Sequence, residues 1–288
     1  MSTPEQLLAA HDPAGALAAL TVQVRAKPAD TKLRVFLAQL LCVLGQWERA
    51  LNQLSVAAEM DAAAIPMKQM YGEAIRCEGL RAEVFAGKRT PMIFGQPDEW
   101  LALLVESLLR IGAGDAAAGE QLRERAFDAA PATSGTLDGQ RFEWLADADM
   151  RLGPVLEAFV NGRYYWVPFS RLAAVKIEAP EDLRDAVWMP AHLTFANGGE
   201  QLALIPTRYD GSQASSDGAL QLARKTEWQE RAPEVWTGLG QRSFSSDAGE
   251  HALMDVREIV FDVEPGASAA EAGQGDAEDA TQDSAAGG

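Results

Sequence analysis

Two acidic residues one position apart are the strongest sign of chemistry in this sequence. Asp147 and Asp149 begin the stretch "DADMRLGPVLEAFVNGRYYWVPF" (147–169), and Arg151 follows two positions later. Apolar and charged residues alternate over "RFEWLADADMRL" (141–152), which predicts a strand with both carboxylates on one face. A pair placed in this way is able to hold one Mg²⁺ or Mn²⁺ ion, as in nucleotide-dependent transferases. One hypothesis is therefore a divalent-metal-dependent enzyme centred on Asp147 and Asp149.

The same residues also have two readings without catalysis. Buried carboxylates need hydrogen-bonding or charged partners, so Asp147, Asp149 and Arg151 would form a structural charge cluster. Arginines on neighbouring strands would then pair with the carboxylates, and the sequence offers three of them: Arg163, Arg208 and Arg242. Alternatively, the cluster would belong to a surface that contacts another protein. We prefer the structural interpretation.

The companion motifs of an enzyme are missing from the sequence. It contains no Walker-type phosphate loop, and Gly238-Leu239-Gly240 is not followed by the third glycine of a dinucleotide loop. There is no Gly-x-Ser-x-Gly nucleophile elbow and no Cys-x-x-Cys. None of the three histidines has a second histidine or a cysteine at helical spacing: they are His11, His192 and His251. We therefore expect no catalytic residue, no metal and no cofactor.

Charge and composition favour a protein partner. The net charge is −17, of which five acids in residues 265–288 contribute −5. The remaining −12 repels phosphate backbones and anionic lipid surfaces, so we expect neither nucleic-acid nor membrane binding. No apolar run approaches the ~20 residues of a membrane helix, and the N-terminus lacks the pattern of a signal peptide. Cys42 and Cys77 lie in apolar helical contexts, which is typical of free thiols in a reducing cytoplasm.

Helical patterns fill the first 130 residues or so. "TKLRVFLAQLLCVLG" has apolar residues at helical spacing, Gly45 stops it, and "WERALNQLSVAAEM" follows at once. Ala16 and Leu20 precede Ala50 and Leu54 by 34 residues, which is the tetratricopeptide period. The pattern predicts tetratricopeptide-like helical hairpins, and the alternative is an ordinary antiparallel bundle.

Strand patterns follow the helices. Asn161-Gly162 joins two apolar runs as a hairpin turn, Asn197-Gly198 lies between two later runs, and "SDGALQLARKTEW" (216–228) predicts one helix. The fold class is thus α+β with several domains, the second strand-rich and partly barrel-like. We expect a tetratricopeptide-like domain over 1–132, an α+β domain over 133–264 and a disordered acidic tail over 265–288.

Longer stretches resemble the ImpE/TagJ family, accessory proteins of type VI secretion systems. The resemblance is carried by "FLAQLLCVLGQWERALNQL", "GKRTPMIFGQPDEW", "FEWLADADMRLGPVLEAFVNGRYYWVPF" and "PEDLRDAVWMPAHLTFANGGE", and it continues through "IPTRYDGSQASSDGALQLARKTEW" and "GLGQRSFSSDAGEHALMDVREIVF". It covers about residues 7 to 262 in the family's order, and the acidic tail lies outside it.

The resemblance implies a tetratricopeptide-like domain followed by an α+β domain particular to the family. It implies a non-enzymatic role, in which the protein binds the N-terminal segment of the small contractile-sheath subunit. It also implies an association with the AAA+ ATPase that disassembles contracted sheath. No catalytic residue is carried over from the family.

A concave face of stacked hairpins is suited to capturing a peptide. The candidate protein-binding residues on the helical domain are Arg34, Gln39, Gln53, Gln69, Tyr71 and Arg76. The alternative is binding by aromatic residues of the α+β domain, namely Tyr164, Tyr165 and Trp166. The sequence leaves the oligomeric state open, as well as which domain holds the peptide.

Overall fold

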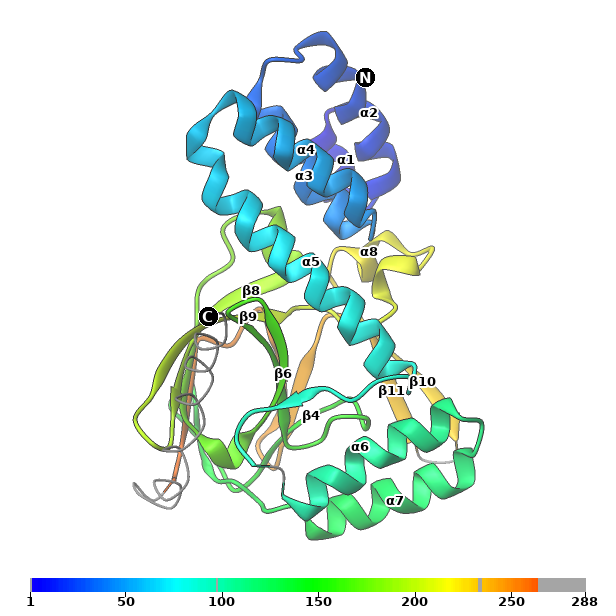
Figure 1. Cartoon of the computed structure of the whole chain (residues 1–288), viewed down its shortest axis with the longest axis vertical. Coiled ribbons are helices and arrows are strands. Elements are labelled where there is room, and N and C mark those ends of the chain that lie inside the picture. The colour runs from blue at the N-terminus through cyan, green and yellow to red at the C-terminus, as the bar shows by residue number, and fades with distance from the viewer. Residues whose placement is uncertain (1, 97, 233–234, 264–288) are drawn as a thin grey trace, which may run out of the picture.

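Helices form where the apolar spacing and the capping residues predict them. The computed structural model describes residues 2–96, 98–232 and 235–263, and Figure 1 shows how they are arranged. Asp12, Asp30 and Asp115 each cap a helix by accepting a hydrogen bond from a backbone N–H three residues on. The helices of this part are α1 (Pro4–Ala9), α2 (Pro13–Ala26), α3 (Thr31–Val43), α4 (Trp47–Met60), the short 3₁₀ turn η1 (Ala62–Ala64), α5 (Ile65–Phe85), α6 (Glu99–Gly112) and α7 (Ala116–Ala129).

The α3–α4 hairpin turns at Gly45, the residue that the sequence marks as a stop. Gly45 has a φ of 65°, a conformation that residues with a Cβ rarely adopt. A Cβ at this position would also lie 2.7 Å from Cγ of Gln213. Ala38 and Ala50 are fully buried where the two helices pack together. A tight turn between helices with small contact residues is the geometry of a tetratricopeptide-like hairpin.

Helix α5 connects the helical hairpins to the strand-rich part of the molecule (Figure 1). Its start lies beside α4, and its later turns contact strand β6. After α5 the chain forms the short strand β1 (Met92–Ile93), which pairs in parallel with β6. Helices α6 and α7 then pack against each other beside the sheet.

A strongly curved sheet dominates the second part of the chain (Figure 1). In the described residues its strand order is β1-β6-β5-β9-β8-β7-β14-β2-β3, and apart from β1 with β6 all neighbours are antiparallel. The end strands β1 and β3 do not pair with each other, so the sheet stays open and "barrel-like" describes only its curvature. Its other strands are β2 (Gly135–Leu137), β3 (Gln140–Phe142), β5 (Val155–Val160), β6 (Arg163–Pro168), β7 (Leu172–Ile177), β8 (Trp188–Phe195), β9 (Glu200–Pro206) and β14 (Glu258–Phe261).

Two smaller sheets complete this part. One pairs β10 (Thr226–Ala232) with β11 (Val235–Gly240), and the other has the order β13-β12-β4. The latter consists of β4 (Leu145–Asp147), β12 (Ser243–Ser246) and β13 (Gly249–Ala252). In the described part of the chain, four short helical turns connect strands: η2 (Phe169–Arg171), η3 (Leu183–Ala186), η4 (Ser212–Ala214) and α8 (Gly218–Gln221). The fold is therefore α+β, as the sequence predicts.

The Asn161-Gly162 turn is confirmed as the link between β5 and β6. Both residues have positive φ, 49° and 71°, as this two-residue hairpin turn requires. Asn197-Gly198 likewise lies between β8 and β9. The predicted acidic tail of residues 265–288 lies outside the described residues.

Two predicted elements are wrong. The single strand expected over 141–152 is broken into β3, β4 and a turn, because Gly153 has a φ of 60° and its carbonyl accepts the N–H of Asp147. The helix expected over 216–228 ends after one turn, α8. Ala223 then takes a φ of 53°, and the chain enters β10, which pairs with β11 along its length. Pairing with a neighbouring strand thus overrides the local helical pattern.

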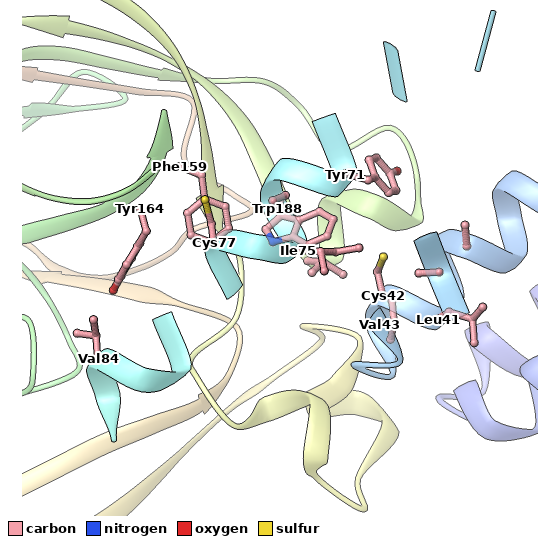
Figure 2. Close-up of a cluster of buried hydrophobic side chains, with 14 of the residues drawn as sticks. Leu41, Cys42, Val43, Tyr71, Ile75, Cys77, Val84, Phe159, Tyr164 and Trp188 are labelled. Carbon is pink, nitrogen blue, oxygen red and sulfur yellow. The ribbon is translucent and has the colours of Figure 1, made fainter. Parts of the chain in front are cut away.

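One continuous core joins the helices to the strands. Figure 2 shows α5 side chains, including Ile75 and Cys77, between those of α3 and those of the sheet. Trp188 of β8 is fully buried and lies edge-on to the ring of Tyr71 from α5, 5.6 Å between centroids. Cys42 and Cys77 are buried free thiols. No helix in the described part of the chain has both the length and the apolar composition to span a bilayer.

Candidate functional site

The carboxylates of Asp147 and Asp149 are buried, and all of their oxygens have protein partners. Asp147 ends β4 and is 3% exposed, and Asp149, in the following turn, is 0% exposed. Asp147 Oδ1 accepts the Asp149 N–H at 2.9 Å, and its Oδ2 contacts the Arg242 guanidinium. Asp149 Oδ1 accepts both the backbone N–H and Nε–H of Arg151 at 2.9 Å. Its Oδ2 accepts Arg151 Nη2 at 2.6 Å and the Gly238 N–H at 3.0 Å, so each of the four oxygens has a protein partner.

Glu157 lies deeper, at the centre of the same charges. It belongs to β5 and is 0% exposed. Its Oε1 accepts Arg81 Nε at 2.8 Å and the Tyr164 hydroxyl at 2.5 Å. Its Oε2 accepts Arg81 Nη2 at 3.1 Å and also contacts Arg242. Arg242 therefore lies between Glu157 and Asp147, while Arg81 reaches the strand from helix α5.

Two further residues extend these contacts to the helical part. Glu78, one turn before Arg81 on α5, accepts Arg81 Nη1 at 3.4 Å and the Trp188 indole N–H at 2.8 Å. Arg208 donates from Nη1 to the Val43 carbonyl at 2.7 Å, at the end of α3. We call the set of four acids and four arginines the buried charge network: Glu78, Asp147, Asp149, Glu157, Arg81, Arg151, Arg208 and Arg242.

The pKa values reflect this balance of opposite charges. Burial raises the pKa of Glu157, but the positive charges of Arg81 and Arg242 outweigh it and lower that pKa to about 2. Burial raises the pKa of Asp147 to about 7, although the neighbouring Arg242 acts in the opposite direction. Three of the four arginines, Arg81, Arg151 and Arg242, form ion pairs with the acids, which offsets much of the cost of burying these charges.

The sequence predicts only part of this network. Of the three arginines offered as partners, Arg242 contacts Asp147, Arg208 binds backbone carbonyls, and Arg163 is exposed at the start of β6. Arg81 and Glu157 were missed. Glu157 had a detectable signal, since it is the one acid within the otherwise apolar run "VLEAFV", all of which is buried.

A groove opens on the helical hairpins, away from the network. It has a volume of about 460 Å³ and lies between α3, the end of α4 with η1, the first turn of α5, and η3 of the α+β domain. Apolar side chains form much of its surface: Val35, Phe36, Ala63, Ala64, Met67 and Leu183. Thr31, Lys32, Gln39, Asp61 and Asp182 supply its polar groups. This is an open apolar site with a few polar contacts at its edges.

The six candidate protein-binding residues fall into different places. Gln39 lines the groove and donates from Nε2 to the Tyr71 hydroxyl at 3.3 Å and to Asp182 Oδ2 at 3.1 Å. Tyr71 itself is 1% exposed, so it lies behind Gln39 in the core and not on the surface. Arg34 and Gln53 bond each other at 2.9 Å across α3 and α4.

Gln69 and Arg76 are exposed on α5 and do not line the groove. The aromatic residues of β6, the alternative binding surface, pack into the protein. Tyr164 and Trp166 are 2% and 0% exposed, and Tyr165 packs edge-on against Phe94. Tyr164 and Trp166 belong to the core, whereas Tyr165 is half-buried at its edge. Sequence reasoning missed the apolar groove residues Phe36 and Met67, and no local pattern separates them from core positions.

A second apolar hollow lies at the other end of the molecule. It has a volume of about 430 Å³ and lies between the end of α7 and β4. Phe127, Trp144 and Met150 line it, together with several alanines and prolines. Trp144 is 40% exposed. Its surface carries few polar groups that would select a ligand.

Comparison with known proteins identifies the chain's relatives. A model of the ImpE protein family matches residues 139–260, and a tetratricopeptide-repeat model matches residues 7–71. The chain is 55% identical over 258 residues to the Type VI secretion system accessory component TagJ of Pseudomonas aeruginosa, and the match covers 90% of each chain. This chain belongs to the ImpE family. The resemblance inferred from its motifs is thereby confirmed.

A solved structure supports the fold of this ImpE-family chain. The crystal structure of a Vibrio parahaemolyticus protein matches it with a TM-score of 0.82 and 24% identity, covering 91% of this chain and 98% of that one. At this identity the likeness shows the fold alone. The groove spans the two family matches: α3 lies within the tetratricopeptide match, whereas Asp182 and Leu183 lie within the ImpE match.

Proposed function

We propose that this protein is a non-enzymatic accessory component of a type VI secretion system, working in the cytoplasm as an adaptor. In this role it holds the N-terminal segment of the small contractile-sheath subunit and assists the AAA+ ATPase that disassembles the sheath. The name of the relative from Pseudomonas aeruginosa supports the accessory role. The choice of sheath segment and ATPase rests on the family resemblance.

The groove is the observation that carries the proposal. It is open and largely apolar, and it lies on tetratricopeptide-like hairpins, which commonly hold peptides on a concave face. The eight residues from Lys32 to Gln39 along α3 correspond to roughly 10 Å of helix. This length matches about two turns of a helical ligand, whose apolar side would cover Val35 and Phe36.

The surroundings of Asp147 and Asp149 do not support the alternative hypothesis of a metal-dependent enzyme. A metal ion bound by Asp147 and Asp149 would have to displace arginines and backbone donors that already satisfy every carboxylate oxygen. Among the described residues, no group of three or more His, Cys, Asp and Glu side chains is arranged to hold a metal ion. The geometry instead suits the structural role that we expect for these residues.

Calorimetric titration of the full-length protein with a synthetic peptide of the sheath subunit's N-terminus tests the proposal. We expect micromolar or tighter binding, about −8 kcal/mol at the micromolar limit. Val35→Glu places a carboxylate in the groove, at a partly buried position, and should weaken binding at least tenfold.

Val22→Glu is the matched control, because Val22 is 64% exposed on α2 and does not line the groove. It should bind like the wild type. Absence of heat with the wild-type protein, together with no competition from the intact sheath subunit, would refute the adaptor role. For the ATPase, sheath disassembly should proceed faster with the wild-type protein than with Val35→Glu.

A further inference from the structure

The groove is closed at one end by the α+β domain, through the turn η3. Leu183 adds an apolar wall there, and Asp182 adds a carboxylate. Gln39 from α3 donates to that carboxylate at 3.1 Å, so the two domains meet at this point. A peptide in the groove would therefore contact both domains and not the helical hairpins alone.

Asp182 is held in place by its own turn. Asp182 Oδ1 accepts the Arg184 N–H at 2.9 Å, and the buried Asp185 accepts the N–H groups of Glu181 and Asp182 at 2.7 and 2.9 Å. Asp185 also pairs with the Arg184 guanidinium at 2.6 Å, which compensates its charge. Among the described residues, the charged nitrogen nearest to the Asp182 carboxylate is Arg184 Nε at 3.8 Å, and the Asp182 side chain is 42% exposed.

The charges along the groove are unevenly distributed. Lys32, in the first turn of α3, and Asp61, at the end of the antiparallel α4, are of opposite sign at the same end. Asp182 lies beside Gln39, two turns further along α3, with no lysine or arginine among the other groove-lining residues there. The Asp182 end therefore carries the net negative charge of the groove.

We propose that Asp182 is a specificity-determining residue of this groove: it selects a helical segment that carries a lysine or arginine next to its apolar face. The basic side chain would lie against the Asp182 carboxylate while apolar neighbours cover Phe36, Met67 and Leu183. This proposal rests on the proposed function, because it assigns the chemistry of the peptide that the groove holds. Opposite charges at such a site set register and selectivity more than total affinity.

The test uses the full-length protein, the synthetic sheath-subunit peptide, and peptide versions in which each lysine or arginine is replaced singly by glutamine. Asp182→Asn removes the charge and keeps a side chain that caps helical turns well. We expect Asp182→Asn to bind the unmodified peptide about three- to tenfold more weakly than the wild-type protein does at low salt. For one of the glutamine peptides, the affinity for the wild-type protein should fall by the same factor. Asp182→Asn should bind that glutamine peptide and the unmodified peptide equally well.

Glu181→Gln is the matched control, since Glu181 is an exposed carboxylate next to Asp182 that does not line the groove. It should bind every peptide like the wild type, and melting curves should show that both variants are folded. If Asp182→Asn and Glu181→Gln have equal effects, or if no glutamine peptide couples to Asp182, the inference is wrong. If the wild-type peptide does not bind at all, the proposed function fails instead. If it binds and Val35→Glu weakens it while Asp182→Asn does not, only the specificity assignment fails.

Discussion

At the scale of single residues, charge compensation explains why so many ionised groups lie inside this protein. Glu157 is 0% exposed, yet two arginines and the Tyr164 hydroxyl contact it. Breaking a buried pair by removing one partner is costly because the other charge is left alone. The Asp-x-Asp motif that first suggested metal chemistry is thus one edge of a larger assembly of buried acids and arginines.

The lowered pKa of Glu157 predicts acid sensitivity. A carboxylate whose pKa falls from 4.5 to about 2 on folding stabilises the folded state above pH 4.5, and this stabilisation is lost as the pH falls toward 2. The loss should be on the order of 3 kcal/mol by pH 2. Urea denaturation at several pH values would measure it.

Glu157→Gln should lack this acid-dependent component and be less stable at pH 7 by roughly 3–5 kcal/mol. Glu143→Gln serves as the control because the Glu143 side chain is 72% exposed. Should the wild type and Glu157→Gln lose stability in parallel between pH 4.5 and 2, the acid sensitivity would originate elsewhere.

At the scale of elements, α5 is the helix on which the fold depends. Tyr71, Ile75, Glu78, Arg81 and Phe85 follow one another at spacings of three or four residues, so they share one face. That face is turned toward the strands and contains a charged pair as well as apolar residues. A search for an apolar stripe therefore does not reveal it.

Replacing either of two glycines, one within α5 and one at the end of α6, by alanine should change the stability of the protein in opposite directions. A Cβ at Gly79, in the exposed middle of α5, would have no atom within 4 Å. Gly79→Ala should therefore raise the free energy of unfolding by roughly 0.5–1 kcal/mol, since alanine favours the helix. A Cβ at Gly112 would lie 2.5 Å from the Ala86 carbonyl oxygen and 2.6 Å from Gly87 Cα, because α6 packs closely there.

Gly112→Ala should consequently lower the free energy of unfolding by roughly 1–3 kcal/mol. Chemical denaturation of both variants beside the wild type would show the contrast. If both variants changed the free energy of unfolding equally, the close packing of α6 against the end of α5 would not contribute to stability.

At the scale of the whole molecule, the helical hairpins and the α+β domain are joined by buried contacts. Arg81 pairs with Glu157, Arg208 binds the Val43 carbonyl, and Gln39 bonds Asp182. These links connect residues 76 to 165 positions apart in the chain. Helices and strands on the two sides of residue 132 therefore share one hydrophobic cluster, while a second cluster lies within the strand-rich part.

We expect the full chain to unfold in a single transition. Far-ultraviolet circular dichroism and tryptophan fluorescence should follow the same curve in urea, because neither part keeps its buried charges compensated alone. Arg81→Met should destabilise the protein by roughly 3–5 kcal/mol, whereas Arg110→Met, with a side chain 54% exposed, should change little. Two separate transitions in the wild type would contradict this coupling.

Local patterns were sufficient to predict much of the architecture. Some signals act over only a few residues and can be recognised in the sequence: the helix cap at Asp12, the stop at Gly45 and the turn at Asn161-Gly162. The family motifs can be recognised in the same way. The break of the strand over 141–152 and the early end of α8 were not, because the pairing of β4 with β12 and of β10 with β11 decides them.

The role of a polar residue depends on partners that the local sequence does not contain. Asp147 meets an arginine 95 positions away, and Gln39 meets Asp182 across 143 positions. Tyr71 and Gln69 are two residues apart on α5, yet one is buried and the other exposed. Burial and charge compensation arise only when the helices pack on the strands, which is why the groove and the buried charge network could be located only in the folded protein.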